Sequence, residues 1–70
     1  MNFDKTAYRE KFQWIRENCT LKMMEITNSM GVSAFLLRRF LLTDDKLRTD
    51  SIVKIRQWID KKEKAIKEQQ

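Results

Sequence analysis

Apolar residues recur three and four positions apart in four segments of the chain, the spacing that places side chains on one face of an α-helix. The first helix is expected to follow Asp4, whose carboxylate is suited to cap the free N–H groups of a helix start. The second is expected to span Leu21 to Met30, with Thr20 as its cap. This pattern predicts a helical protein without a sheet.

The second half of the pattern begins at Gly31, the single glycine of the chain. Glycine tolerates a left-handed backbone, so Gly31 is predicted to end the second helix. Ser33 is expected to cap a third helix that continues to about Leu41. A fourth helix is expected to start at a cap formed by Asp50 or Ser51.

The four apolar faces are predicted to meet in one core. We therefore expect a compact all-α bundle of about four to five helices. The expected core residues are Phe12, Ile15, Leu21, Met24, Ile26, Met30, Val32, Leu37, Phe40, Leu47, Ile52, Ile55 and Ile59.

Composition supports this fold class, because the 70 residues include one glycine and no proline. That scarcity of turn residues disfavours an all-β fold and favours helices joined by short loops. Residues 1–62 are expected to form one domain. Residues 63–70, which are mostly Lys, Glu and Gln, are predicted to form a charged C-terminal helical extension.

The chain is basic, with 15 Lys and Arg against 10 Asp and Glu and a net charge of +5. A charge of this sign favours association with a polyanion or an acidic partner. The longest apolar run, residues 34–42, contains Arg38 and Arg39 and is too short to span a bilayer. We therefore expect a cytoplasmic protein that does not associate with membranes.

Enzymatic chemistry is not expected from this composition. Histidine, the commonest general acid or base, is absent, and Cys19 is the single cysteine. One thiolate cannot hold a structural zinc ion, and no glycine-rich phosphate loop is present. The sequence therefore predicts a protein without catalytic residues, metal, cofactor or small-molecule substrate.

The middle of the chain has the order of elements typical of a helix-turn-helix: an apolar helix, Gly31, and a second apolar helix. This segment resembles the lambda-repressor-like helix-turn-helix family, which includes small phage repressors and Cro proteins. The family has apolar inner faces where its helices cross, and usually alanine where Thr27 stands here. The resemblance covers residues 21–59 and rests on the run 23–33, within it Ile26, Met30, Gly31 and Val32, and on Leu37 and Phe40.

The resemblance implies a phage-type transcription regulator that binds double-stranded operator DNA through its third helix. Such regulators commonly act as dimers, so a homodimer is also implied. The residues expected at the bases, or at a protein partner, are Ser33, Ala34, Phe35, Leu36, Arg38 and Arg39. The residues expected at backbone phosphates are Lys22, Lys46, Arg48 and Lys54.

An alternative function follows from Phe35 and Leu36, which cannot form hydrogen bonds with base edges. An adjacent exposed apolar pair is typical of a protein contact. In this respect the chain resembles the antirepressors, or modulators of repression, of temperate phages. Phe35, Leu36, Arg38 and Arg39 would then bind a partner repressor and block its DNA-binding surface. A third interpretation places the apolar pair in a homodimer seam or against the first helix.

Overall fold

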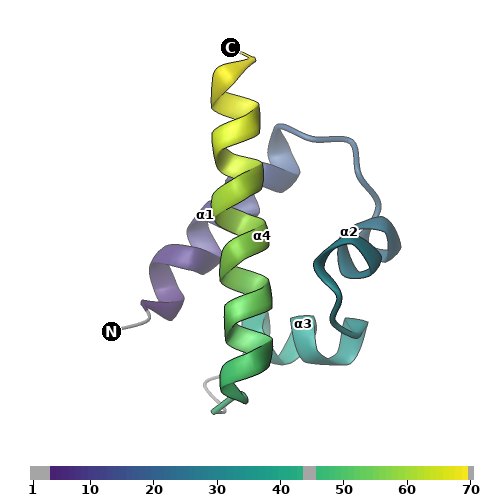
Figure 1. Cartoon of the computed structure of the whole chain (residues 1–70), viewed down its shortest axis with the longest axis vertical. Helices are drawn as coiled ribbons and strands as arrows, with labels where there is room; N and C mark the ends of the chain where they lie inside the picture. Colours follow the sequence, from purple (N-terminus) through teal and green to yellow (C-terminus); the bar gives the residue numbers. More distant parts are fainter. Residues whose placement is uncertain (1–3, 44–45, 70) are drawn as a thin grey trace.

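The computed structural model describes residues 4–43 and 46–69. Residues 1–3, 44–45 and 70, the last at the end of the predicted extension, lie outside the described residues. Every regular element in the described ranges is an α-helix, which confirms the all-helical fold class (Figure 1). The helices are α1 (Lys5–Glu17), α2 (Met23–Met30), α3 (Ala34–Leu42) and α4 (Thr49–Glu68).

Three predicted helix ends are confirmed. The Asp4 carboxylate accepts a hydrogen bond of 3.1 Å from the Ala7 N–H, and the Ser33 hydroxyl accepts one of 3.1 Å from the Leu36 N–H. Each bond satisfies an N–H group that the helix itself leaves without a partner. Gly31 ends α2 in the left-handed region, with φ of 81°.

The other two predicted caps are wrong. The first backbone hydrogen bond of α2 runs from the Ile26 N–H to the Lys22 carbonyl, so Lys22 rather than Thr20 is the N-cap. In α4 the Arg48 carbonyl accepts the first bond, and Asp50 lies inside the first turn. An acidic residue in the first turn is favoured by the helix dipole, so Asp50 stabilises α4 without being its cap.

The core lies between the helices: α4 packs on α1 and α2, and α3 packs on the same two helices (Figure 1). Its buried apolar members are Phe12, Ile15, Ile26, Met30, Leu37, Phe40, Leu47, Ile55 and Ile59, all of them predicted. Of the other predicted core residues, Leu21, Val32 and Ile52 are half-buried at the edge of the core.

Met24 is wrong as a core prediction, because its side chain is 74% exposed. Ile26 and Met30, four residues apart, set the buried face of α2. Met24 is two residues before Ile26, and residues two apart on a helix point to different sides. The buried threonine of this helix, Thr27, donates a hydrogen bond of 3.0 Å to the Met24 carbonyl.

The orientation of α3 is fixed by two cations from α1. The Arg9 guanidinium donates to the Phe40 carbonyl at 2.8 Å and also to the Thr43 carbonyl, to which the Lys5 ammonium donates at 2.7 Å. These carbonyls are at the negative end of the α3 dipole, where cations are favourable. The opposite, N-terminal end of α3 is left exposed.

Helix α4 continues without a break through the residues predicted as a charged extension and ends at Glu68. Ile66, in these last turns, packs against the core. The 20 residues of α4 run along the long axis of the molecule in Figure 1, and the last turn of α4 lies at the end remote from α3.

Candidate binding surfaces

The first candidate surface is the start of α3. Helices α2 and α3 are joined by residues 31–33, and Gly31 and Ser33 shape this corner. Ser33, Ala34 and Phe35 are all exposed in the first turn of α3. The corner therefore presents a capped helix start to solvent, with a small residue beside a large aromatic one.

The outward face of α3 is formed by Phe35, Arg38, Arg39 and Leu42, which we call the α3 stripe. Phe35 is 68% exposed and Leu42 is 76% exposed. The Arg39 guanidinium lies 5.8 Å from the centre of the Phe35 ring, within the range of a cation–π contact. Phe35 and Leu42, seven residues apart, thus lie on either side of the two arginines on one face of α3.

Leu42 was missed by the sequence analysis, and Leu36 was placed wrongly as part of an exposed pair. Leu36 is half-buried and packs against the core, because it is four residues before the buried Phe40 and shares its side of α3. Leu42 is seven residues after Phe35, which returns it to the same face after two turns. That spacing is visible in the sequence and could have identified Leu42.

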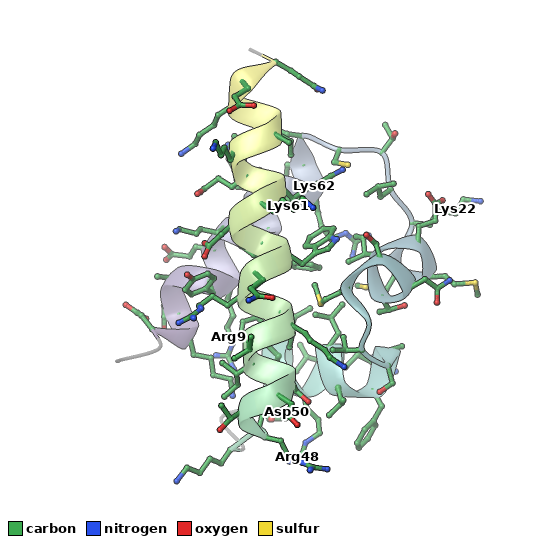
Figure 2. All side chains as sticks on the ribbon, viewed as in Figure 1. Arg9, Lys22, Arg48, Asp50, Lys61 and Lys62 are labelled. Atoms are coloured by element: carbon green, nitrogen blue, oxygen red, sulfur yellow. The ribbon has the colours of Figure 1, made fainter. Side chains whose placement is uncertain are left out.

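The four cations predicted to contact phosphates are all exposed: Lys22, Lys46, Arg48 and Lys54. Lys22 and Arg48 are the N-caps of α2 and α4, and neither helix start has a side-chain hydrogen bond to its free N–H groups. Figure 2 shows Lys22 beside α2 and Arg48 at the start of α4. Lys54 lies elsewhere, on the side of α4 that faces α2.

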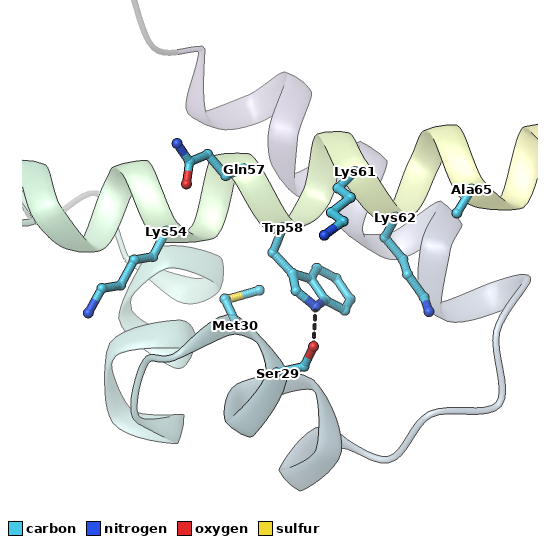
Figure 3. A pocket seen from close by; sticks show the side chains of 8 residues that line it. All are labelled: Ser29, Met30, Lys54, Gln57, Trp58, Lys61, Lys62 and Ala65. Atoms are coloured by element: carbon cyan, nitrogen blue, oxygen red, sulfur yellow. Dashed lines mark hydrogen bonds between the residues drawn. The ribbon is translucent and has the colours of Figure 1, made fainter.

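A groove between α2 and α4 is the second candidate surface. Its volume is about 410 Å³. The Trp58 indole N–H donates a 3.1 Å hydrogen bond across it to the Ser29 hydroxyl, and Lys54 and Lys62 lie on either side of the indole (Figure 3). The residues that line this α2–α4 groove are Ser29, Met30, Lys54, Gln57, Trp58, Lys61, Lys62 and Ala65.

The lining of the α2–α4 groove contains three lysines and no acidic residue. Among the described residues, none of these lysines forms an ion pair. Of these lysines, the sequence predicts Lys54 alone as a binding residue, whereas Lys61 and Lys62 were not expected. These lysines lie near Trp58 and Ser29 because of the way α2 packs on α4. A pattern within one helix does not predict that packing.

The opposite side of α4 faces α1 and forms what we call the α1–α4 seam. The Tyr8 hydroxyl donates a 3.0 Å hydrogen bond to Asp60, and Lys11 lies 3.9 Å from Asp60 and 3.8 Å from Glu63. Lys67 lies 3.7 Å from Glu63 on the same helix. Burial raises the pKa of Tyr8 above its usual 10.0, and the hydrogen bond to Asp60 adds to this shift.

A second hollow, of about 510 Å³, lies between α1 and the end of α3. Leu42 of the α3 stripe contributes to its lining. The residues that line it are Arg9, Phe12, Gln13, Arg16, Glu17, Leu41 and Leu42.

Within residues 4–43 and 46–69, no three His, Cys, Asp or Glu side chains are grouped so that they could hold a metal ion. No helix in these ranges has the length and apolarity needed to cross a membrane. Comparisons with protein-family models, curated proteins and solved structures found no match to this chain.

Proposed function

We propose that this protein is a small DNA-binding regulator in which α2, the Gly31 corner and α3 act as a helix-turn-helix. The start of α3 would enter the major groove, as the second helix of that motif does. The observation that carries the proposal is the placement of Lys22 and Arg48 as exposed N-caps of α2 and α4.

Cations at helix starts are unfavourable in the free protein. The N-terminus of a helix carries a partial positive charge, and a nearby charge interacts with it by about 0.3–1 kcal/mol. A phosphate at such a position would accept hydrogen bonds from the free N–H groups and also pair with the cation. Lys22 and Arg48 would therefore hold the DNA backbone at the starts of the two helices that precede and follow α3 in the chain, with Lys46 close to Arg48 in sequence.

Base contacts would come from the α3 stripe. Arg38 is exposed, and an arginine can bind both acceptors of a guanine in the major groove. Phe35 can contact a thymine methyl group but forms no hydrogen bond. Ser33 already accepts a bond from the Leu36 N–H, and Ala34 is small enough to let the helix start approach the groove. Recognition by so few polar groups would depend strongly on phosphate contacts.

The test is a fluorescence-anisotropy titration with duplex DNA from upstream of the protein's own gene and with a scrambled duplex. We expect tighter binding to the first duplex, and an affinity that falls steeply between low and physiological salt. The Lys22→Gln/Arg48→Gln double variant should reduce the salt slope by roughly 0.9 for each phosphate that the protein no longer neutralises.

The matched control is Arg16→Gln/Lys64→Gln, which removes the same charge from exposed positions that are not helix starts. It should retain most of the affinity and the salt slope. A salt-independent titration, or an equal loss of affinity in both double variants, would contradict the DNA-binding proposal.

A second candidate function is supported by the exposure of Phe35 and Leu42 on one face of α3. Apolar anchors spaced over two helical turns are typical of a helix that docks in the groove of another protein. The α3 stripe could then cover the DNA-binding surface of a partner repressor, with Arg38 and Arg39 pairing with acidic groups around it. The protein would in that case act as an antirepressor.

The two functions are separated by a mobility-shift assay with the partner repressor, taken as a DNA-binding regulator encoded beside this protein's gene, and with the operator of that regulator. An antirepressor should release the regulator's DNA without binding that DNA itself. Phe35→Ser and Leu42→Ser should each abolish the release, whereas Met24→Ser, a change at an equally exposed apolar residue of α2, should not. Release that persists in both α3 variants would exclude the antirepressor function.

A further inference from the structure

We propose that the α2–α4 groove binds a nucleoside phosphate, a small anion that combines a flat ring with two or more negative charges. This site is separate from the α3 stripe and from the helix starts at Lys22 and Arg48. Four features of the groove support the proposal: its charge, its aromatic wall, its polar groups and its size.

The charge of the groove is uncompensated. Lys54, Lys61 and Lys62 line it together, with no acidic residue in the lining and no ion pair to any described residue. Like charges gathered on one surface repel each other, and an anion with several charges would relieve this repulsion. One phosphate group carries one to two charges at neutral pH, so a nucleoside diphosphate suits three lysines.

The aromatic wall is Trp58, whose position is fixed from two sides. Its N–H donates to Ser29 of α2, and its ring lies 6.2 Å from the Phe12 ring at an angle of 49°. A fixed indole can stack on a nucleobase, a contact worth about 1–3 kcal/mol per base. Because Lys54 and Lys62 extend on either side of the indole, phosphates would lie close to the stacked ring (Figure 3).

The remaining polar groups of the groove can read the edge of a base. The exposed Gln57 amide offers both a donor and an acceptor. The Ser29 hydroxyl accepts the Trp58 N–H and keeps its own O–H to donate. The volume of about 410 Å³ falls within the usual 300–1,000 Å³ of small-molecule sites.

The probe for the test is ADP, titrated against the full chain without DNA and followed by tryptophan fluorescence and by the thermal midpoint. Trp14→Phe removes the second tryptophan, which lies near Lys67 and outside the groove, and so isolates the Trp58 signal. We expect ADP to change the Trp58 emission in a saturable way and to raise the midpoint, since a ligand of the folded state stabilises it. Adenosine and inorganic phosphate, added separately, should bind more weakly.

The matched variants are Lys62→Gln, within the groove, and Lys64→Gln, an exposed lysine two residues away that does not line it. We expect Lys62→Gln to weaken ADP binding by about tenfold, the effect of removing one charge-assisted hydrogen bond. Lys64→Gln should leave the ADP affinity within about twofold, the effect of an exposed charge.

Three results would overturn the proposal. The first is the absence of any change in fluorescence or midpoint with ADP. The second is an equal loss of ADP affinity in the two lysine variants, which would indicate general attraction to a basic protein. The third is binding of a single-stranded oligonucleotide, but not of ADP, with the same dependence on Lys62. Because no arm uses the upstream duplex, each result is independent of the DNA-binding proposal.

Discussion

Helix α4 has charged residues on the side that faces α1 and on the side that faces α2, and the two sets differ in whether they are paired. In the α1–α4 seam, Lys11 forms ion pairs with both Asp60 and Glu63, and Lys67 forms a second ion pair with Glu63. Asp60 also accepts a hydrogen bond from the Tyr8 hydroxyl. In the α2–α4 groove, the charged lining consists of lysines alone. One helix of 20 residues therefore has a compensated side and an uncompensated side.

This difference separates charges that serve the fold from charges that are available for a ligand. Exposed ion pairs contribute about 0–1 kcal/mol each, and in the seam those of Lys11 join α1 to α4. The groove lysines have no such partner among the described residues, so their positions do not contribute to stability through pairing. Variants along α4 can test this division.

The largest expected effect is that of Ile59→Ala, which removes a fully buried side chain of α4 from the core. We expect a loss of about 2–5 kcal/mol in the free energy of unfolding, because the truncation leaves a cavity. Urea denaturation followed by circular dichroism measures this loss. Ile66→Ala, at a half-buried position of the same helix, should cost clearly less; equal losses would mean that the core extends further along α4 than the structure shows.

A smaller loss is expected for Gly31→Ala, at the corner next to the groove. A Cβ atom there would lie 3.9 Å from the Lys54 side chain, which is an ordinary contact. The cost arises instead from the φ of 81°, at which an L-residue is strained by about 1–2 kcal/mol. Thermal unfolding should show that Gly31→Asn is milder, since asparagine tolerates this region better. If both variants were neutral, the left-handed corner would be wrong.

The seam is expected to lose stability in alkali through Tyr8. Its pKa is raised in the folded state above the usual 10.0, so folding favours the protonated phenol. The resulting stabilisation is complete below pH 10 and is lost as pH rises through the folded pKa, when a phenolate would face Asp60. The measurement is the difference between the wild type and Tyr8→Phe, because contributions common to both proteins cancel in it. That difference in unfolding free energy should shrink above pH 10; a constant difference would contradict the assignment.

The smallest effects distinguish the two sides most directly. Lys67→Gln removes one of the two cations paired with Glu63 and should reduce stability by about 0.5 kcal/mol or less at low salt. Lys62→Gln removes a cation that has no ion pair among the described residues, and should leave stability unchanged or slightly increased. High salt should diminish both effects. Equal losses in the two variants would remove the distinction between seam and groove.

The features of the fold that could be predicted from sequence are those decided within a few residues. Gly31 and Ser33 end and begin helices through their own backbone and side-chain chemistry, and both were predicted correctly. Lys22 and Arg48 could not be identified as caps in this way, because their side chains provide no cap and packing determines where α2 and α4 begin. Local chemistry favoured Thr20 for α2 and Asp50 or Ser51 for α4, but none of these residues is the N-cap.

The candidate surfaces were less predictable for the same reason. The exposure of Phe35 was expected, whereas the burial of Leu36 depends on which side of α3 faces the core. The α2–α4 groove combines residues 29 and 30 with residues 54–65, a separation that no periodicity within one helix encodes. The excess of Lys and Arg over Asp and Glu can be counted in the sequence. Only the packed structure shows that three of the lysines line one groove.

The length of α4 also has a practical consequence. At about 1.5 Å per residue its 20 residues extend roughly 30 Å, close to the 34 Å longest dimension of the molecule. A dye or a surface tether attached at the end of α4 would therefore sit far from the Gly31 corner and the start of α3 (Figure 1). Immobilisation through that end presents α3 to solution, and energy transfer from a dye there to a labelled ligand reports which end of the molecule the ligand occupies.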